Sequence, residues 1–181
     1  MSRIFGPVTQ NGYVVEDLDA AIDNWTRVLG IGPFFKFPVG FESYCYRGKE
    51  ISPTPELMVA IGNSGNLQIE LIQQTNDAPS QYLDFLRECG PGLQHLSVWT
   101  ESYEADLERF KSLGYEIDLA AKLKGAGRVV FYDTGVHAGA MMEVLEFLPS
   151  SQAVMKFVRE AAIGWDGSEP VRSLPGTLKK V

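Results

Sequence analysis

Cysteine and histidine are scarce in this chain. Its 181 residues include two cysteines, Cys45 and Cys89, and two histidines, His95 and His137. Two cysteines are too few for a disulfide-rich secreted domain, and the first residues lack the apolar core of a signal peptide. We therefore expect free thiols and a cytoplasmic protein.

Long apolar runs and an excess of positive charge are also missing. No hydrophobic stretch approaches the roughly 20 residues that a membrane-spanning helix needs, so we expect no membrane partner. The 23 acidic residues outnumber the 16 basic ones and give a formal net charge of -7. This charge repels a phosphate backbone, so we also expect no nucleic-acid partner.

An internal repeat is the most informative feature that is present. Adding 85 to the residue numbers of the first amphipathic helix, expected at residues 17–29, reproduces its apolar face. The offset maps Leu18, Ile22, Trp25 and Val28 onto Tyr103, Leu107, Phe110 and Leu113. A glycine follows each stripe, at Gly30 and Gly114, where a left-handed helix cap is least costly. A duplicated supersecondary unit limits the possible folds more than composition does.

The order of periodic segments is similar in the two halves. Strand and helix patterns predict a βαβββ unit in residues 1–74, a linker in 75–92 and a second βαβββ unit in 93–148. Residues 149–181 are expected to form a helix and a tail that packs on the surface. In the first unit, residues 34–39, 41–47, 56–61 and 67–73 have strand character. We expect an α+β fold built from two tandem units.

Polar side chains occupy equivalent positions in strands that are otherwise apolar. The offset of 85 maps Gln10 onto His95, each in the first strand of its half. The last strand of each half carries a carboxylate between apolar neighbours, Glu70 in one and Glu143 in the other. Each residue alone is typical of a solvated or hydrogen-bonded structural position. Together they form a symmetric set. Because burying unpaired polar groups is costly, one shared role explains the set better than four separate structural roles.

These four side chains have the chemistry of a metal site. One amide oxygen, one imidazole nitrogen and two carboxylate oxygens suit a divalent ion that keeps open positions for water or substrate. The absence of a thiolate argues against a closed structural zinc site. We expect Gln10, Glu70, His95 and Glu143 to bind one divalent metal, with Zn, Ni, Co, Mn and Fe left open.

The ordered motifs resemble the vicinal oxygen chelate (VOC) superfamily, the group of glyoxalase I and methylmalonyl-CoA epimerase. They are Gln10-Asn-Gly-Tyr-Val-Val, Leu67-Gln-Ile-Glu70, Gly92-Leu-Gln-His95 and Met142-Glu143-Val-Leu-Glu, within roughly residues 5–148. The resemblance implies two βαβββ modules that form a curved mixed-sheet cleft, with a C-terminal helical extension here. It implies a homodimer, and it puts the four donors at the family's ligand positions. The set is similar to that of glyoxalase I, whereas the epimerases more often have His first and Gln at the position of Glu70.

The expected chemistry follows from a metal that chelates two neighbouring substrate oxygens. Such a metal stabilises the negative charge that remains when a proton leaves the adjacent carbon. We therefore expect a glyoxalase I-like lyase or an epimerase-like isomerase. Its substrate would be a small organic acid, thioester or glyoxal-type compound that reacts through an enolate or enediolate. Glu143 or Glu70 would act as the catalytic base, if one of them detaches from the metal as substrate binds.

Two other functions stay open at this point. The first is a non-catalytic protein that binds a small molecule in a cleft of the same fold. The second is an extradiol-type dioxygenase, whose iron needs two histidines and one carboxylate. This second function is disfavoured, because His137 lies in an expected turn at residues 134–139 and not at a ligand position.

A basic loop and an aromatic pair are further candidates for ligand contact. Lys122, Lys124 and Arg128 surround two glycines. Such a loop can bind a phosphate, but it is more typical of a solvated hairpin turn, which we expect here. Phe34 and Phe35 are expected to form an apolar wall of the ligand pocket.

Overall fold

The computed structural model describes residues 2–135 and 141–176. In these residues the helices are α1 Leu18–Arg27, α2 Gln81–Cys89, α3 Tyr103–Ser112 and α4 Pro149–Ala161. The strands are β1 Gln10–Val14, β2 Phe34–Val39, β3 Phe41–Tyr46, β4 Lys49–Glu50, β5 Leu57–Ser64, β6 Leu67–Gln74, β7 Gly92–Thr100, β8 Ile117–Leu123, β9 Arg128–Tyr132, β10 Met141–Glu146 and β11 Val171–Arg172.

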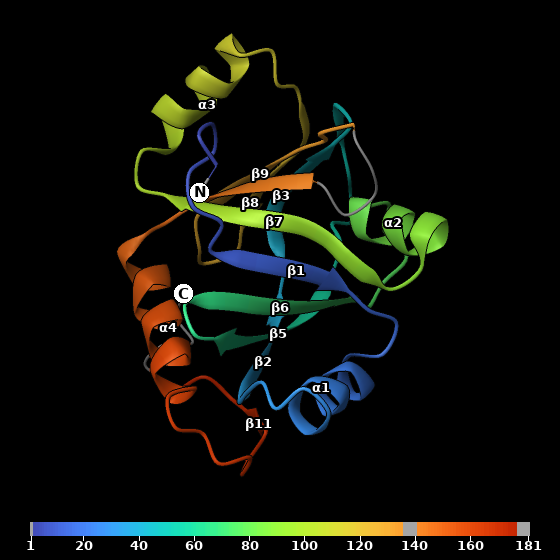
Figure 1. Ribbon diagram of the computed structural model, residues 1–181. Helices are drawn as coiled ribbons and strands as arrows, with labels where there is room; N and C mark the ends of the chain where they lie inside the picture. Colours follow the sequence, from blue (N-terminus) through green and yellow to red (C-terminus); the bar gives the residue numbers. More distant parts are fainter. Residues whose placement is uncertain (1, 136–140, 177–181) are drawn as a thin grey trace.

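All these strands belong to one curved mixed sheet (Figure 1). Its order is β11-β2-β5-β6-β1-β7-β10-β9-β8-β3-β4. The strand β1 pairs in parallel with β6 and antiparallel with β7, and β7 pairs in parallel with β10. The first strands of the two halves therefore lie side by side in the middle. The expected α+β fold class, with its curved mixed sheet, is confirmed.

One expected strand of the first half joins the second half instead. The strand β3, whose residues were expected in the first unit, pairs antiparallel with β8 of the second. Alternation identifies a strand but not the edge that it joins. The strands β2 and β3 lie near opposite ends of the sheet, yet only Gly40 separates them in the chain. One residue spans only about 3.5 Å. The sheet must therefore curl until its two ends meet, and it encloses an interior.

The helices α1 and α3 cover the outer surface of the sheet. Leu18 and Ile22 of α1 pack with Ile69 and Leu71 of β6, which alternate with the inward-facing residues of that strand. The helix α3 packs through Tyr103 and Phe110 in the second half.

The helix α1 ends two residues earlier than expected. The Asp17 side chain accepts a hydrogen bond of 3.0 Å from the backbone N–H of Ala20 and begins the helix. The helix ends at Arg27, and Val28 is its C-cap. Val28 is therefore 74% exposed and not part of the buried stripe, which corrects the prediction for this position. The glycine cap is as expected, since Gly30 has a φ of 67°.

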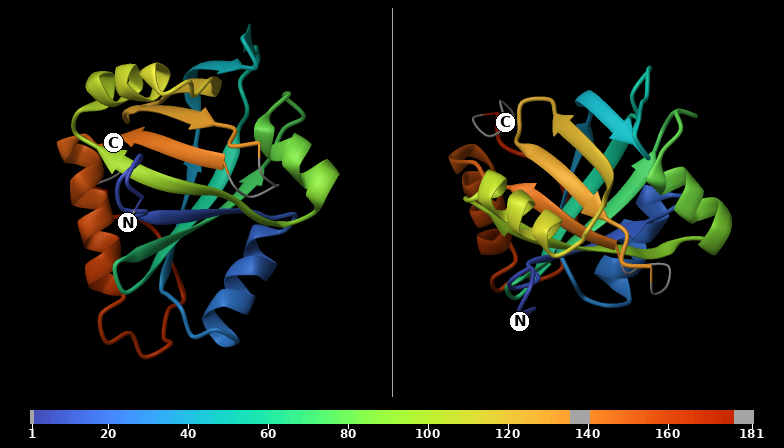
Figure 2. Two further views of the ribbon diagram at one scale, coloured as in Figure 1. Left: turned by 45° about the horizontal axis from the view of Figure 1, so that its top comes forward. Right: turned by 90° about the horizontal axis from the view of Figure 1, so that it is seen from above.

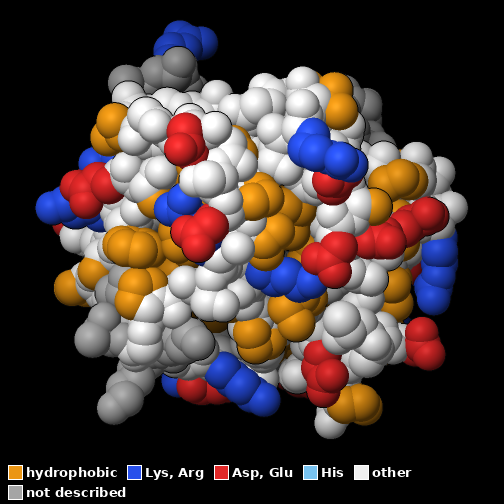
Figure 3. Space-filling view, turned by 90° about the horizontal axis from the view of Figure 1, so that it is seen from below, with side chains coloured by type: hydrophobic (Ala, Val, Ile, Leu, Met, Phe, Trp, Pro, Cys, Tyr) orange, Lys and Arg blue, Asp and Glu red, His pale blue; other side chains and the backbone are white. Residues whose placement is uncertain are grey.

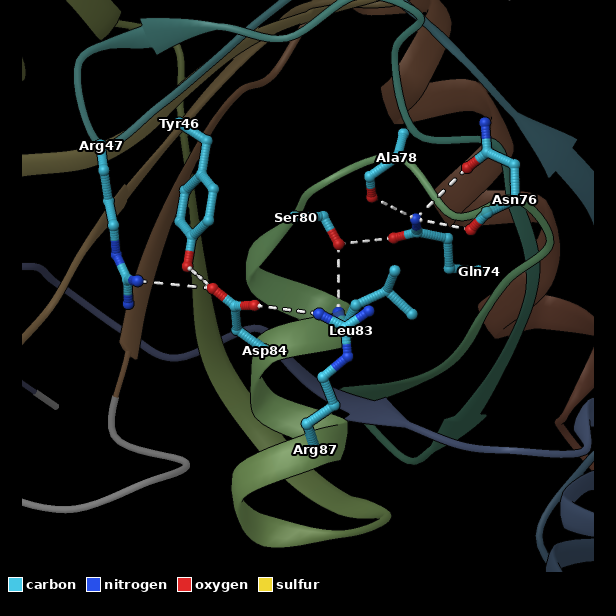
Figure 4. A network of polar contacts seen from close by, with 9 residues as sticks. All are labelled: Tyr46, Arg47, Gln74, Asn76, Ala78, Ser80, Leu83, Asp84 and Arg87. Carbon is cyan, nitrogen blue, oxygen red and sulfur yellow. Dashed lines mark hydrogen bonds and ion pairs between the residues drawn. The ribbon is translucent and has the colours of Figure 1, made fainter.

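The helices α2 and α4 lie at opposite ends of the central strands (Figures 1 and 2). The helix α2 is fixed at its start by a polar network (Figure 4). The Ser80 side chain accepts a hydrogen bond from the Leu83 backbone N–H at 3.1 Å and donates one to Gln74 Oε1 at 2.5 Å. One turn later, Asp84 accepts a hydrogen bond of 2.9 Å from the Tyr46 hydroxyl. The network joins α2 to both halves of the sheet, through β6 and β3.

The C-terminal segment is part of the sheet and of the core. The helix α4 follows the expected spacing, with Val154 and Val158 buried. The tail was expected to pack on the surface, and part of it also reaches the interior. Its residues Val171–Arg172 form β11, which pairs in parallel with β2, and Leu174 is buried in the interior cluster.

The surface agrees with the composition. Cys45 and Cys89 are free thiols, as expected. In the described residues, no helix has the length and apolar character needed to cross a membrane. Seen from below, hydrophobic side chains reach the surface between basic and acidic ones (Figure 3). In Figure 1, α1 and β11 lie at this lower end of the molecule.

Replacing Leu174 by alanine tests the structural role of the tail. Because this side chain is 7% exposed and lies in the interior cluster, we expect Leu174→Ala to lower the free energy of unfolding by about 2 kcal/mol. The matched control is Val171→Ala in the same tail, at a side chain that is 48% exposed, where we expect a loss under about 0.5 kcal/mol. Urea unfolding measures both, and equal losses would contradict the burial of Leu174.

Candidate metal and active site

The predicted donors lie on four neighbouring strands in the middle of the sheet. The strands β6, β1, β7 and β10 carry Glu70, Gln10, His95 and Glu143 in that order. In the pairing register, Gly12 of β1 is opposite both Glu70 and His95. Gln10 and Glu143 are each opposite Ser97 of β7. The four residues therefore face the same side of the sheet, toward its interior.

The imidazole of His95 lies between the two carboxylates. Its Nε2 is 3.6 Å from Oε2 of Glu70 and 3.8 Å from Oε2 of Glu143. The exposed fractions of the His95, Glu70 and Glu143 side chains are 1%, 18% and 11%. Nε2 of His95 and Oε2 of Glu143 are buried without a hydrogen-bond partner. Buried polar atoms of native proteins are usually paired, so these two atoms are available to a ligand.

The neighbouring Gln94 fixes the orientation of this imidazole. Its side-chain oxygen lies 2.6 Å from Nδ1 of His95. Because a carbonyl oxygen only accepts hydrogen bonds, Nδ1 carries the proton and Nε2 of the neutral ring presents a lone pair. The amide of Gln94 donates in turn to Sδ of Met141 at 3.2 Å. The ring edge also packs on Phe131, with centroids 5.0 Å apart. Sequence reasoning missed Gln94, since a buried glutamine has no distinctive pattern.

The lack of a side chain at Gly12 makes room for the ring of His95. A Cβ atom on Gly12 would lie 1.9 Å from Cε1 and 2.3 Å from Nε2 of the His95 ring. The imidazole therefore occupies the space that any other residue at position 12 would fill. Sequence reasoning also missed Gly12, because its role depends on the register between β1 and β7.

The fourth predicted donor, Gln10, is held by another glutamine. Its Nε2 donates a hydrogen bond of 2.8 Å to Oε1 of Gln68. The amide of Gln68 donates to Sδ of Met155 in α4 at 3.0 Å. With its nitrogen engaged in this way, the remaining donor atom of Gln10 is its oxygen. Gln68 is a further residue that sequence reasoning did not single out.

Burial and mutual repulsion change the acidity of the site. Burial of the Glu143 carboxyl, together with the charge of Glu70, outweighs the attraction of His95 and raises the pKa of Glu143 to about 7. Burial lowers the pKa of His95, but the charges of Glu143 and Glu70 outweigh this effect and raise it above its ordinary value. A carboxyl group whose pKa is near neutral can both accept and donate a proton at physiological pH.

The site opens into a cavity of about 920 Å³ that Gln10, Glu70 and Glu143 help to line. Tyr82 of α2 lies at the wall, and Met155 of α4 contributes from another side. The prediction that Phe34 and Phe35 form an aromatic wall of the cavity is wrong. Phe34 lies in the cluster under α1 and Phe35 in the interior core. The aromatic side chains that line the cavity are Phe37, Phe41 and Tyr82.

The chemical types of these donors fit a divalent ion, although the donor atoms are not arranged as closely as the ligands of a bound ion. Among the described residues, no group of three His, Cys, Asp or Glu side chains has the arrangement of a formed metal site. Two ligands at about 2.1 Å from a tetrahedral ion are about 3.4 Å apart. The separations of 3.6 and 3.8 Å from His95 are close to this value. The unpaired Nε2 and the unpaired carboxylate oxygen are also the atom types that such an ion binds.

The other histidine of the chain is His137. His137 lies outside the residues that the structure describes. The expectation that it occupies a turn, away from any ligand position, therefore stays a prediction.

Comparison with known proteins identifies the fold. The family model for the glyoxalase/bleomycin resistance protein/dioxygenase superfamily matches residues 9–132. A methylmalonyl-CoA epimerase from Mycobacterium tuberculosis has a similar structure, with a TM-score of 0.56 and 22% identity. That likeness covers 84% of this chain and 95% of the epimerase. No curated protein matches the chain in sequence.

Two more solved structures resemble the chain to a similar extent. A hypothetical protein from Bacillus halodurans has a TM-score of 0.56 at 19% identity, over 78% of this chain and 94% of its own. A Streptomyces coelicolor methylmalonyl-CoA epimerase in complex with 2-nitronate-propionyl-CoA has a TM-score of 0.52 at 16% identity, over 78% and 97%. At such identities the likeness extends to the fold alone.

Replacing Gly12 by alanine tests the packing of His95 without removing a donor. The added Cβ would overlap the imidazole, so we expect Gly12→Ala to shift the ring and weaken Zn²⁺ binding about tenfold or more. The chain has two histidines, so the imidazole signals in NMR report the shift directly.

The matched control is Gly92→Ala in β7, where an added Cβ has no atom within 4 Å. We expect it to leave Zn²⁺ affinity and the imidazole signals unchanged. Calorimetric Zn²⁺ titration of chelated protein measures the affinity. A Gly12→Ala protein that is folded and binds Zn²⁺ like the wild type would contradict this packing.

The raised pKa of Glu143 predicts a pH dependence of stability in the metal-free protein. Between about pH 4.5 and 7 the unfolded chain releases this proton while the folded chain keeps it. Stability should therefore fall as the pH rises through this window, and His95 acts in the same direction. We expect Glu143→Gln to be more stable than the wild type at pH 8 by about 1 to 3 kcal/mol, with little difference near pH 4.5.

The control for this measurement is Glu146→Gln on the same strand. The Arg128 guanidinium lowers the pKa of Glu146, so this variant should lose stability at neutral pH and not gain it. Urea unfolding of the chelator-treated proteins at several pH values measures the sign of the change in unfolding free energy for both variants. A Glu143→Gln protein that is less stable than the wild type at pH 8 would refute the assignment.

Proposed function

Because the chain belongs to the glyoxalase/bleomycin resistance protein/dioxygenase superfamily, we propose that it is a metal-dependent isomerase or lyase that moves a proton on its substrate. The substrate would be a small organic acid, thioester or glyoxal-type compound with two neighbouring oxygens. The observation that carries this proposal is the convergence of His95, Glu70 and Glu143 at one buried point that opens into the cavity.

The residues that would hold the metal are His95 through Nε2, Glu70 and Glu143 through their carboxylates, and Gln10 through its side-chain oxygen. A divalent ion there would act as a Lewis acid for two substrate oxygens and stabilise the negative charge of an enolate or enediolate. Zn, Ni, Co, Mn and Fe all remain compatible with these ligands.

Glu143 is the group best suited to move the proton. It is the more buried of the two carboxylates, and one of its oxygens has no hydrogen-bond partner. Its pKa is about 7 in the metal-free protein, so a Glu143 carboxylate that detaches from the metal as substrate binds would be in the working range of a general acid and base. Glu70 comes from the other side of the two central strands. The cavity therefore presents a carboxylate from each half, as proton removal on one face of a carbon and return on the other requires.

The structural neighbours favour the isomerase within this proposal. Two of the similar structures described above are methylmalonyl-CoA epimerases, and one holds 2-nitronate-propionyl-CoA. Glu70 and Gln10, in contrast, follow the glyoxalase I pattern more closely. Both reactions transfer a proton next to an oxygen-bearing carbon, so the proposal concerns this shared step. We also propose, on family resemblance alone, a cytoplasmic homodimer.

Metal content and solvent proton exchange test the proposal together. We expect about one divalent ion per wild-type chain by mass spectrometry, and exchange of the substrate C–H for deuterium in D₂O. The test substrates are a methylmalonyl thioester and the thiol adduct of methylglyoxal. Because Gln keeps an oxygen donor but holds no exchangeable acid proton, Glu143→Gln should retain much of the metal and lose exchange at least 100-fold.

Two further variants rank the metal donors. His95→Ala should lose most of the metal, whereas Gln10→Ala, which removes a neutral donor, should lose less. A wild-type protein that takes up no divalent ion would refute the proposal. A protein that binds metal and both substrates without any exchange would be a non-catalytic binding protein.

A further inference from the structure

The cavity has two chemically different ends. The carboxylates of Glu70 and Glu143 lie on strands next to the central pair, β1 and β7. Gly40 and Lys124, which also line the cavity, lie where the two ends of the sheet meet. In a sheet that curls until its ends meet, this junction is across the interior from the central strands. A molecule that fills the cavity therefore reaches from the carboxylates to Lys124.

The side chain of Lys124 lies along the junction itself. Its backbone N–H donates a hydrogen bond of 2.9 Å to the carbonyl of Gly40. A Cβ on Gly40 would lie 3.4 Å from Cδ and 3.7 Å from Nζ of Lys124. Lys124 is exposed although it lines the cavity. Lys124 thus lies at the mouth of the cavity, between solvent and the interior.

The cationic side chains near Lys124 form ion pairs with carboxylates, whereas Lys124 forms none among the described residues. Lys122 pairs with Glu42 at 2.5 Å, and Arg128 pairs with Glu146 at 2.8 Å. The other lysine of the cavity wall, Lys36, pairs with Asp19 at 2.6 Å. Within residues 2–135 and 141–176, no carboxylate forms an ion pair with Lys124. The expectation of a solvated turn is therefore incomplete, because one of its three cations faces the cavity without a partner.

Apolar side chains line the space between the two ends. Phe37 and Phe41 come from the strands that meet at Gly40, and Leu57, Val129 and Leu145 complete the wall. Such a wall favours an apolar ligand body, and each buried methylene adds to its binding.

We propose that the cavity takes an elongated organic acid whose carboxylate binds Lys124 at the mouth and whose apolar body fills the interior. This inference deepens the proposed function, on which it rests, because the oxygen-bearing end that reacts would then reach His95, Glu70 and Glu143. A carboxylate fits better than a phosphate group, since one unpaired ammonium faces it and Glu56 also lines the mouth. Without metal, Glu70 and Glu143 repel an anion and orient it toward Lys124.

The test compares two ligands of equal length on chelated protein, so that it does not depend on metal or turnover. The probes are octanoate and the neutral octanamide, titrated by calorimetry at pH 7.5 and low salt. We expect wild-type protein to bind octanoate about fivefold more tightly than octanamide. Lys124→Met keeps the apolar stem and removes the charge, so it should make the two affinities equal.

The matched control is Lys122→Met, which removes a neighbouring exposed cation that does not line the cavity. It should preserve the preference for octanoate, and raised salt should reduce the preference in the wild type. An unchanged preference in a folded Lys124→Met protein would overturn the proposal. Failure to bind either probe, or tighter binding of octyl phosphate, would do the same. All these outcomes are independent of metal uptake and proton exchange, which test the proposed function.

Discussion

The single-residue connection at Gly40 is the constraint on which the interior of this protein depends. Strands that belong to opposite ends of the sheet must lie next to each other there. The curvature that follows turns an open sheet face into an enclosed wall, and α2 and α4 cover its ends. Because the side chains of His95, Glu70 and Glu143 are largely shielded from solvent there, their charges interact more strongly than on an open sheet. The electrostatic character of the site is thus a consequence of chain connectivity.

Strand alternation separates two carboxylates that are close in sequence. Glu143 and Glu146 belong to the same strand, β10. Glu143 faces the interior, where burial raises its pKa, and Glu146 accepts hydrogen bonds from Arg128, which lower its pKa. The first carboxylate is costly for folding and the second is favourable. A fold that keeps Glu143 charged and buried gives up stability at this position, as functional sites commonly do.

The sequence predicted the placement of the four polar residues better than their surroundings. The duplication and the period of two are local patterns, and they were sufficient to identify Gln10, Glu70, His95 and Glu143 as residues on one face. The place of β3 was not predictable, since a period of two does not specify a partner strand. Gly12 was missed, and Lys124 was named only within a loop expected to be solvated, for a related reason. Their roles depend on the residues that other strands bring near, and neither differs from its sequence neighbours in composition.

The two terminal strands of the sheet, β11 and β4, are each two residues long. A long exposed edge offers a row of free N–H and C=O groups to which another chain can add a strand, and short edges offer few of them. The tail that completes the core through Leu174 thus also shortens the accessible edge beside β2. The cover is partial at both ends, since β11 pairs with β2 at Phe34 and Phe35 and β4 pairs with β3 at Cys45 and Tyr46. Strand addition from a second chain would be limited to the short remaining edges of β2 and β3.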